Sequence, residues 1–350
     1  MEKLVFIMVV ILFLLGCDSE SSTNNSTQNN TIDTKTKLQV LSVNEIAALM
    51  YQAQTIFGAI PEKMPGGEKD TPNMRKLGKH LFFEKRLSKN NKQSCNSCHN
   101  LNKNGPGVDN RSVSPGAFGD KGGRNSPTVL NAGFHIAQFW DGRAKDLVEQ
   151  AKGPVLNPIE MAMPNEKYVE KKLRSIKKYR ILFRRAFPRD KQPVSYGNMA
   201  SAIAAFERTL ITRDRFDDFL KGDPLALNNK ELKGLKLVIE KGCISCHNGP
   251  LLGANSFQIA GLVNRYPGKI DMGRFEITKN ELDKEKFKVP SWRNIAITAP
   301  YFHDGGTNTL KKAVQQMAWM QLGKKLDSEE VDLIVVFLST LTDKKKVTKP

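Results

Sequence analysis

Two short stretches of the sequence share one form: Cys95-Asn96-Ser97-Cys98-His99 and Cys243-Ile244-Ser245-Cys246-His247. Two cysteines three positions apart lie on one helical turn and can form thioethers with the two vinyl groups of a haem. The histidine that follows each pair is placed to ligate the iron. We therefore predict two covalently bound c-type haems, with His99 on the first iron and His247 on the second.

Two other uses of these cysteines remain open at this point. Four thiolates can hold a zinc ion, although the two pairs are far apart in sequence and each carries an adjacent histidine. A thioredoxin-like dithiol is the second alternative, but no βαβ pattern surrounds either pair. The adjacent histidines favour haem over both.

Beyond residue 40 the apolar residues recur at helical spacing, and we find no convincing run of alternating residues that indicates a strand. Thr71 followed by Pro72 predicts a helix start, because proline is favoured at the first helical position. The predicted helices are 43–57, 72–83, 165–176, 179–187, 195–211, 228–241, 309–320 and 327–341. The long loops 100–127 and 248–269 are expected to wrap a ligand.

These patterns predict an all-α fold of two cytochrome c-like domains, each wrapping one haem. A length of 350 residues fits two domains. We place the boundary where the helix at 200–212 gives way to the polar segment 213–223. The predicted haem domains are thus 41–212 and 213–342, and a basic tail follows at 343–350.

The N-terminus has the pattern of an export signal. Residues 1–16 carry an apolar run from Leu4 to Leu15, which is too short to span a bilayer comfortably but suits a signal peptide. The run ends in Leu14-Leu15-Gly16-Cys17, which resembles a bacterial lipobox, whose cysteine is lipidated; an ordinary signal peptide is the alternative. Residues 17–40 are polar and predict a flexible tether. We expect an exported, periplasmic protein anchored to a membrane through Cys17.

Seven further stretches carry a family resemblance. They are Leu77-Gly78-Lys79-His80-Leu81-Phe82-Phe83, Arg124-Asn125-Ser126-Pro127-Thr128, Gln138-Phe139-Trp140-Asp141-Gly142-Arg143, Glu149-Gln150-Ala151, Asn157-Pro158-Ile159-Glu160-Met161, Val289-Pro290-Ser291-Trp292-Arg293-Asn294 and Thr298-Ala299-Pro300-Tyr301-Phe302-His303-Asp304-Gly305. Together with the haem motifs they resemble the bacterial dihaem cytochrome c peroxidases, in order from about residue 43 to 341.

The resemblance implies an enzyme and its catalytic residues. In that family the N-terminal haem reacts with hydrogen peroxide, and the C-terminal haem receives electrons from a small cytochrome c or cupredoxin. Glu160 matches the catalytic glutamate, and Gln150 matches the glutamine that supports it. A carboxylate above an open iron can take a proton from peroxide and return it to the leaving oxygen.

The resemblance assigns three further roles and an oligomeric state. Trp140 matches the tryptophan between the haems and is the expected electron conduit. Met317 matches the methionine ligand of the second iron, while Met320, one turn away, is expected to pack. Asn125, Thr298 and Pro300 match the calcium-binding positions. Family members are commonly homodimers.

One position departs from the family pattern. Many members have a histidine on the loop after the first haem motif that caps the peroxidatic iron, and the corresponding residue here is Ala117. The remaining histidines are His80, His135 and His303. We favour packing for His80 and His135, and His303 is a candidate partner of a haem propionate. Either the first haem rests high-spin without a protein cap, which we predict, or another residue caps it.

The formal net charge of +18 has more than one reading. Lysine-rich surfaces are commonly only solvated, but a basic surface also steers an acidic electron donor, and anionic lipid is a further candidate partner. Nucleic acid is not expected, since no basic–aromatic module is present. One competing function is a non-enzymatic dihaem electron carrier, which needs neither Glu160 nor Gln150. The other is a dihaem oxidase of a protein substrate. Met317 disfavours it, because the related dihaem enzyme that matures methylamine dehydrogenase has tyrosine at this position.

Overall fold

The structure is a computed structural model and describes residues 40–346. From Leu41 onward the chain forms one compact unit. The predicted signal peptide, Cys17 and nearly all of the predicted tether lie outside the described residues, as does the end of the predicted tail. Within residues 40–346, no helix is long and apolar enough to cross a membrane.

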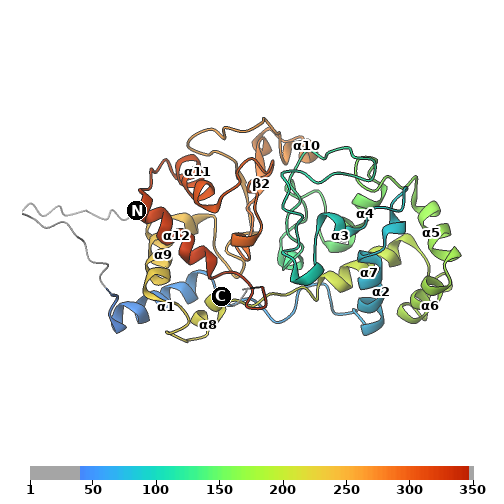
Figure 1. The fold of residues 1–350 in the computed structure, drawn as a ribbon, viewed down its shortest axis with the longest axis horizontal. Helices are drawn as coiled ribbons and strands as arrows, with labels where there is room; N and C mark the ends of the chain where they lie inside the picture. The colour runs from blue at the N-terminus through green and yellow to red at the C-terminus, as the bar shows by residue number, and fades with distance from the viewer. Residues whose placement is uncertain (1–39, 347–350) are drawn as a thin grey trace, which may run out of the picture. The chain divides into compact units, whose positions relative to one another are not determined.

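Helices account for most of the regular structure (Figure 1). In chain order they are α1 (Val43–Ile56), α2 (Pro72–Phe82), α3 (Cys95–Cys98), α4 (Leu147–Leu156), α5 (Glu166–Ser175), α6 (Lys177–Ala186), α7 (Tyr196–Glu207), α8 (Arg215–Leu220), α9 (Asn229–Glu240), α10 (Phe275–Thr278), α11 (Leu310–Leu322) and α12 (Ser328–Ser339). The predicted start at Thr71 is confirmed: its side chain accepts a hydrogen bond from the backbone of Met74, and Pro72 is the first helical residue. The predicted all-α class is confirmed.

A small sheet corrects the expectation that strands are absent. β1 (Phe257–Ile259) and β2 (Lys286–Lys288) pair antiparallel, with Gln258 opposite Phe287. Each strand has only three residues, so neither is long enough to produce a recognisable alternation of apolar and polar residues. Helix α8 lies in the segment 213–223, which was expected to be a polar boundary without regular structure, and it has only 6 residues.

The first hydrophobic core is built by α2 and α4 to α7. Leu77, Phe82, Tyr179 and Phe183 are fully buried in it. A Cβ atom added to Gly78 would lie 1.8 Å from the carbonyl oxygen of Ala202, so the contact between α2 and α7 requires glycine at this position. This core holds α3 and the first Cys-x-x-Cys-His motif at its edge.

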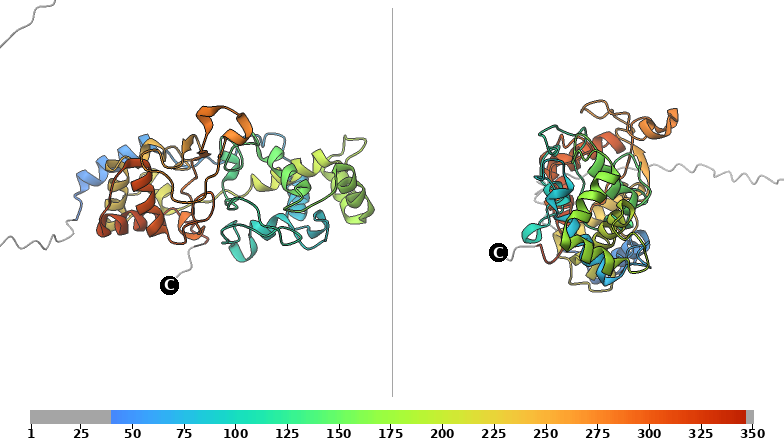
Figure 2. Two further views of the ribbon diagram at one scale, coloured as in Figure 1. Left: turned by 90° about the horizontal axis from the view of Figure 1, so that it is seen from above. Right: turned by 90° about the vertical axis from the view of Figure 1, so that its right-hand side faces the viewer.

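The second core is built by α8, α9 and α12, and α1 joins it. Leu49, Ala53 and Phe57 pack with Phe216 and Phe337. Figures 1 and 2 show the blue helix α1 beside the yellow and red helices of this core. The predicted boundary between residues 212 and 213 stays a prediction, but α1 contributes its apolar side chains to the core of the C-terminal half.

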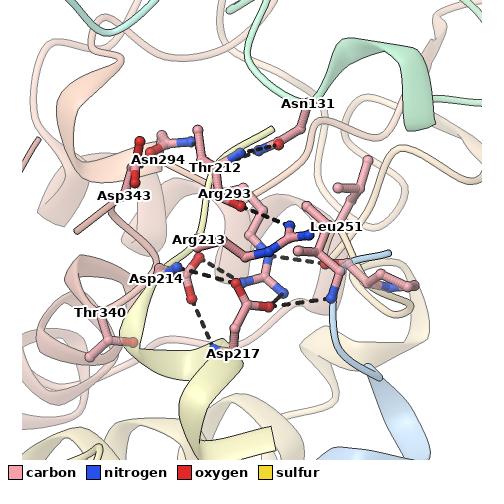
Figure 3. A network of polar contacts seen from close by, with 12 residues as sticks. Asn131, Thr212, Arg213, Asp214, Asp217, Leu251, Arg293, Asn294, Thr340 and Asp343 are labelled. Atoms are coloured by element: carbon pink, nitrogen blue, oxygen red, sulfur yellow. Dashed lines mark hydrogen bonds and ion pairs between the residues drawn. The ribbon is translucent and has the colours of Figure 1, made fainter. Parts of the chain in front are cut away.

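A buried polar network connects three distant segments (Figure 3). The side chain of Arg293 is 1% exposed and contacts Asp214 at 2.6 Å and Asp217 at 3.0 Å. Beside it, the hydroxyl of Thr212 accepts hydrogen bonds from the side-chain amides of Asn131 (2.8 Å) and Asn294 (3.1 Å). Because Asn131 and Asn294 belong to loops of different halves, the segment at Thr212 is tied to both.

Two candidate haem pockets and a candidate active site

The first pocket contains the first Cys-x-x-Cys-His motif. Cys95 and Cys98 lie on the single turn of α3, with free thiols, and line a hollow together with His99. Burial lowers the pKa of His99, and its Nδ1 atom is buried without a hydrogen-bond partner. A neutral imidazole is the form that binds a metal. The two thiols and this ring therefore fit a haem in the manner that the motif predicts.

The second pocket contains the second motif. Cys243, Cys246 and His247 line it, and the Nδ1 atom of His247 lies 3.0 Å from the carbonyl oxygen of Leu252. Burial lowers the pKa of His247 to about 4, so the ring is neutral. A hydrogen bond from Nδ1 to a carbonyl orients an imidazole so that Nε2 is free for a metal. His247 also stacks on Trp292, with ring centroids 4.1 Å apart.

The two pockets differ in the side chains that line them beside the histidine. Glu160 and Gln150 line the first pocket, whereas Met317, on α11, lines the second. Met320 is 1% exposed and belongs to the buried interior. The chemistry of the two pockets is therefore asymmetric: one holds an acid and an amide, the other a thioether.

Glu160 sits in a turn that follows α4. Its Oε1 accepts a hydrogen bond of 2.9 Å from the side-chain amide of Asn157. Burial raises the pKa of Glu160, while the positive charge of Arg143 and the hydrogen bond from Asn157 oppose the rise. A buried carboxyl group with a raised pKa is suited to take up a proton and release it again as a general acid and base.

Trp140 lines both pockets. Its indole Nε1 donates a hydrogen bond of 2.9 Å to the carbonyl oxygen of Asn125, and its own carbonyl oxygen accepts one of 2.7 Å from the backbone of Lys288. One bond holds the indole ring and the other holds the backbone of Trp140, at a position that lines the pockets of both predicted haems.

The three predicted calcium ligands come together beside the second pocket. Asn125, Thr298 and Pro300 all line it. The amide nitrogen of Asn125 donates to the carbonyl oxygens of Arg111 (2.9 Å) and Ser112 (3.3 Å), which leaves Oδ1 as its acceptor. Within residues 40–346 no group of three His, Cys, Asp or Glu side chains could hold a metal ion. The cysteine pairs line different pockets, so the four thiols do not form the zinc site considered above.

Ala117, at the position where many family members have a capping histidine, contacts the turn that carries Glu160. The backbone N–H of Ala117 donates a hydrogen bond of 2.6 Å to the carbonyl oxygen of Glu160. His80, on α2, contacts Lys178 at 3.1 Å, and His135 and His303 line the second pocket. In the described part of the chain, His99 is therefore the one histidine that lines the first pocket.

Each pocket also contains a buried ionisable residue that the sequence did not indicate. Glu207, at the end of α7, lines the first pocket with its Oε2 unpartnered, and burial raises its pKa to about 8. Lys288, on β2, lines the second pocket 3.0 Å from His135, and burial lowers its pKa to about 8. An isolated glutamate or lysine is ordinarily solvated, so nothing in the local sequence signals their burial.

The helical fold and the two Cys-x-x-Cys-His pockets define a protein with two haem sites. A family model described as di-haem cytochrome c peroxidase matches residues 72–224. The chain is 47% identical over 304 residues to the cytochrome c551 peroxidase of Pseudomonas aeruginosa, which covers 85% of this chain and 87% of the relative. It is 48% identical over 275 residues to the cytochrome c551 peroxidase of Nitrosomonas europaea, covering 78% and 81%.

Among solved structures, the chain is similar to a MauG-like protein associated with microbial copper homeostasis, with a TM-score of 0.71 and 30% identity over 83% of this chain and 95% of that one. The chain belongs to the family of di-haem cytochrome c peroxidases. It is an oxidoreductase with haem cofactors, and the predicted family is confirmed.

Proposed function

We propose that the protein reduces hydrogen peroxide to water at the first pocket, with electrons that a small cytochrome c or cupredoxin delivers at the second. The asymmetry of the pockets carries this proposal. His99 shares its pocket with Glu160 and Gln150, and His247 shares its pocket with Met317. Axial methionine raises the potential of a haem and favours its reduction by a donor. Trp140, which lines both pockets, is the proposed conduit between them.

In this proposal each haem is held covalently. Cys95 and Cys98 form thioethers with the first haem, and Cys243 and Cys246 with the second. A haem in the first pocket would supply an iron to bind peroxide and to deliver electrons to it. Glu160 would take one proton from peroxide and return it to the oxygen that leaves as water. Gln150 holds peroxide by hydrogen bonds, and since it is not ionisable it does not compete for that proton.

The first haem is proposed to rest high-spin, because Ala117 cannot ligate iron. The absence of a second histidine from the lining of the first pocket, within the described residues, supports this. Removal of His80 or His135 should leave the spectrum of the oxidised protein unchanged. A low-spin bis-histidine spectrum that either substitution abolishes would contradict the proposal.

The proposal extends to calcium, location, oligomeric state and the choice of donor. Calcium would be held by Asn125 Oδ1 and the carbonyl oxygens of Thr298 and Pro300, since neutral oxygen ligands with waters suit this ion. The protein is exported to the periplasm, anchored through lipidated Cys17, and functions as a homodimer. Its net charge of +18 attracts an acidic donor.

The test is the substitution Glu160→Gln in the dihaem protein, with peroxide turnover measured against a reduced cytochrome c donor. Turnover should fall about 100-fold or more, since the acid–base group is lost. Glu166→Gln is the matched control, because Glu166 is exposed at the start of α5. A non-enzymatic electron carrier would show no turnover in the parent protein in any reduction state. Unchanged turnover in Glu160→Gln would remove Glu160 from the mechanism.

A further inference from the structure

A chain of aromatic rings leads from Trp140 to a tyrosine near the surface. The rings of Trp140 and His303 meet edge to face, with centroids 6.5 Å apart. The centroids of His303 and Tyr266 lie 5.0 Å apart. His303 is held in this position by stacking on Phe287 at 4.1 Å. Electron tunnelling slows steeply with distance, so rings in such close succession form an efficient path.

Tyr266 ends the chain beside a proton acceptor. Its hydroxyl donates a hydrogen bond of 2.6 Å to Oδ1 of Asp304, and burial, together with this bond, raises the pKa of Tyr266 above its usual range. The phenol is therefore neutral and shares its proton with a carboxylate. Both side chains are only partly buried, whereas His303 is 5% exposed.

The loop around Tyr266 is shaped to hold this pair. A Cβ atom added to Gly268 would lie 2.2 Å from the Tyr266 ring and 2.6 Å from Oδ2 of Asp304. The backbone N–H of Gly306 donates a hydrogen bond of 2.8 Å to Oδ1 of Asp304, the oxygen that Tyr266 also uses. The carboxylate is thus oriented by backbone as well as by the phenol.

We propose that Tyr266 is an oxidation site of the enzyme, which supplies an electron through His303 and Trp140 when peroxide arrives and no donor protein is bound. The proposal rests on the reaction with peroxide described above. It gives oxidising equivalents a second destination, used when the donor protein is absent.

The step balances in protons and electrons. Cleavage of the O–O bond of peroxide takes two electrons and releases one water, which carries the two protons of peroxide itself. Without a donor protein, one electron would come from the haem of the first pocket, which would be left oxidised by one electron. Tyr266 supplies the other electron, and its phenolic proton moves along the existing hydrogen bond to Asp304. The product is a neutral tyrosyl radical beside a protonated carboxyl group. Proton and electron return together when a reductant restores the phenol.

The test uses the dihaem protein, one equivalent of hydrogen peroxide, no electron donor and a nitrone spin trap, with the adducts located by peptide mass spectrometry. We expect an adduct at Tyr266, and its loss in Tyr266→Phe. Trp140→Phe and Asp304→Asn should each reduce it several-fold, because the first replaces the indole of the path with a ring that is much harder to oxidise and the second removes the proton acceptor. Tyr168→Phe is the control, since Tyr168 is 48% exposed on α5 and belongs to neither pocket.

Two results would overturn the proposal. One is labelling of Tyr266 no stronger than that of Tyr51, which is 74% exposed. The other is labelling that Trp140→Phe leaves intact, since simple surface oxidation needs no internal path. Turnover with a reduced donor separates this failure from failure of the peroxidase mechanism: the parent and Tyr266→Phe should then turn over peroxide equally.

Discussion

The backbone N–H of Ala117 donates a hydrogen bond of 2.6 Å to the carbonyl oxygen of Glu160. The loop that lacks a capping histidine therefore supports the turn that carries the proposed acid–base residue. A Cβ atom added to the neighbouring Gly116 would lie 1.6 Å from the carbonyl oxygen of Ile159, so the loop and the turn are in direct backbone contact. Asn90 fixes the loop further through a side-chain hydrogen bond to the carbonyl oxygen of Ala117.

Gly116→Ala should separate the loop from the Glu160 turn, because the added methyl group cannot be accommodated against backbone. We expect peroxide turnover to fall about 10-fold or more, since small displacements of catalytic groups are costly. Gly122→Ala is the control, because its Cβ would meet nothing within 4 Å and its backbone needs no positive φ. Equal turnover of the two variants would show that the contact does not position Glu160.

Arg143→Gln should move the acid limb of the pH–rate profile to higher pH. The positive charge of Arg143 favours the carboxylate of Glu160 and partly offsets the rise in pKa that burial causes. Without this charge the pKa of Glu160 rises further, so the reactive carboxylate is lost at a higher pH, by up to about one unit. Arg184→Gln, at an exposed position on α6, should leave the limb in place. A shift of the acid limb to lower pH would show that Arg143 does not favour the carboxylate of Glu160.

Glu207→Gln should stabilise the protein near neutral pH. Burial raises the pKa of Glu207 to about 8, whereas an unfolded glutamate titrates near 4.5. Between these values the folded state holds a proton that the unfolded state releases, so stability falls as the pH rises from about 4.5 to 8. Glutamine removes this dependence, and the gain in free energy of unfolding at pH 7 is up to about 3 kcal/mol.

Denaturant unfolding of the Glu207→Gln variant and its parent at pH 4 and pH 7 measures that gain. The two proteins should differ little at pH 4, where the glutamate is protonated in both states. A difference of the same size at both pH values would mean that packing rather than titration separates them.

Met317→Leu should lower the reduction potential of the haem in the second pocket. Met317 lines that pocket, and loss of a thioether ligand lowers the potential of a haem. Turnover with a reduced donor should fall about 10-fold or more, because the second haem then accepts electrons poorly. Met320→Leu is the matched control, since Met320 is buried one helical turn away. Potentiometric titration measures the reduction potential of the second haem in both variants. If Met317→Leu and Met320→Leu have the same potential, Met317 is not the ligand.

Local sequence was sufficient for the helical class and for the two haem motifs. The helix start at Thr71 and Pro72 was predicted because a cap and a first-position proline act within a few residues. The three-residue strands β1 and β2 were missed because their pairing depends on residues far apart in the chain. The packing of α1 was missed for the same reason: an apolar stripe shows that a helix has a buried face, but not which core buries it.

The sequence by itself determined the chemistry of the protein. Two Cys-x-x-Cys-His motifs, Glu160, Gln150, Trp140 and Met317 were all visible as residue types in recognisable surroundings. Only the tertiary structure decided that Glu207 and Lys288 are buried in the linings of the two pockets and that the ring of Tyr266 contacts His303. Burial and the juxtaposition of distant segments cause this difference, since both set pKa values and ring contacts and neither is encoded in local sequence.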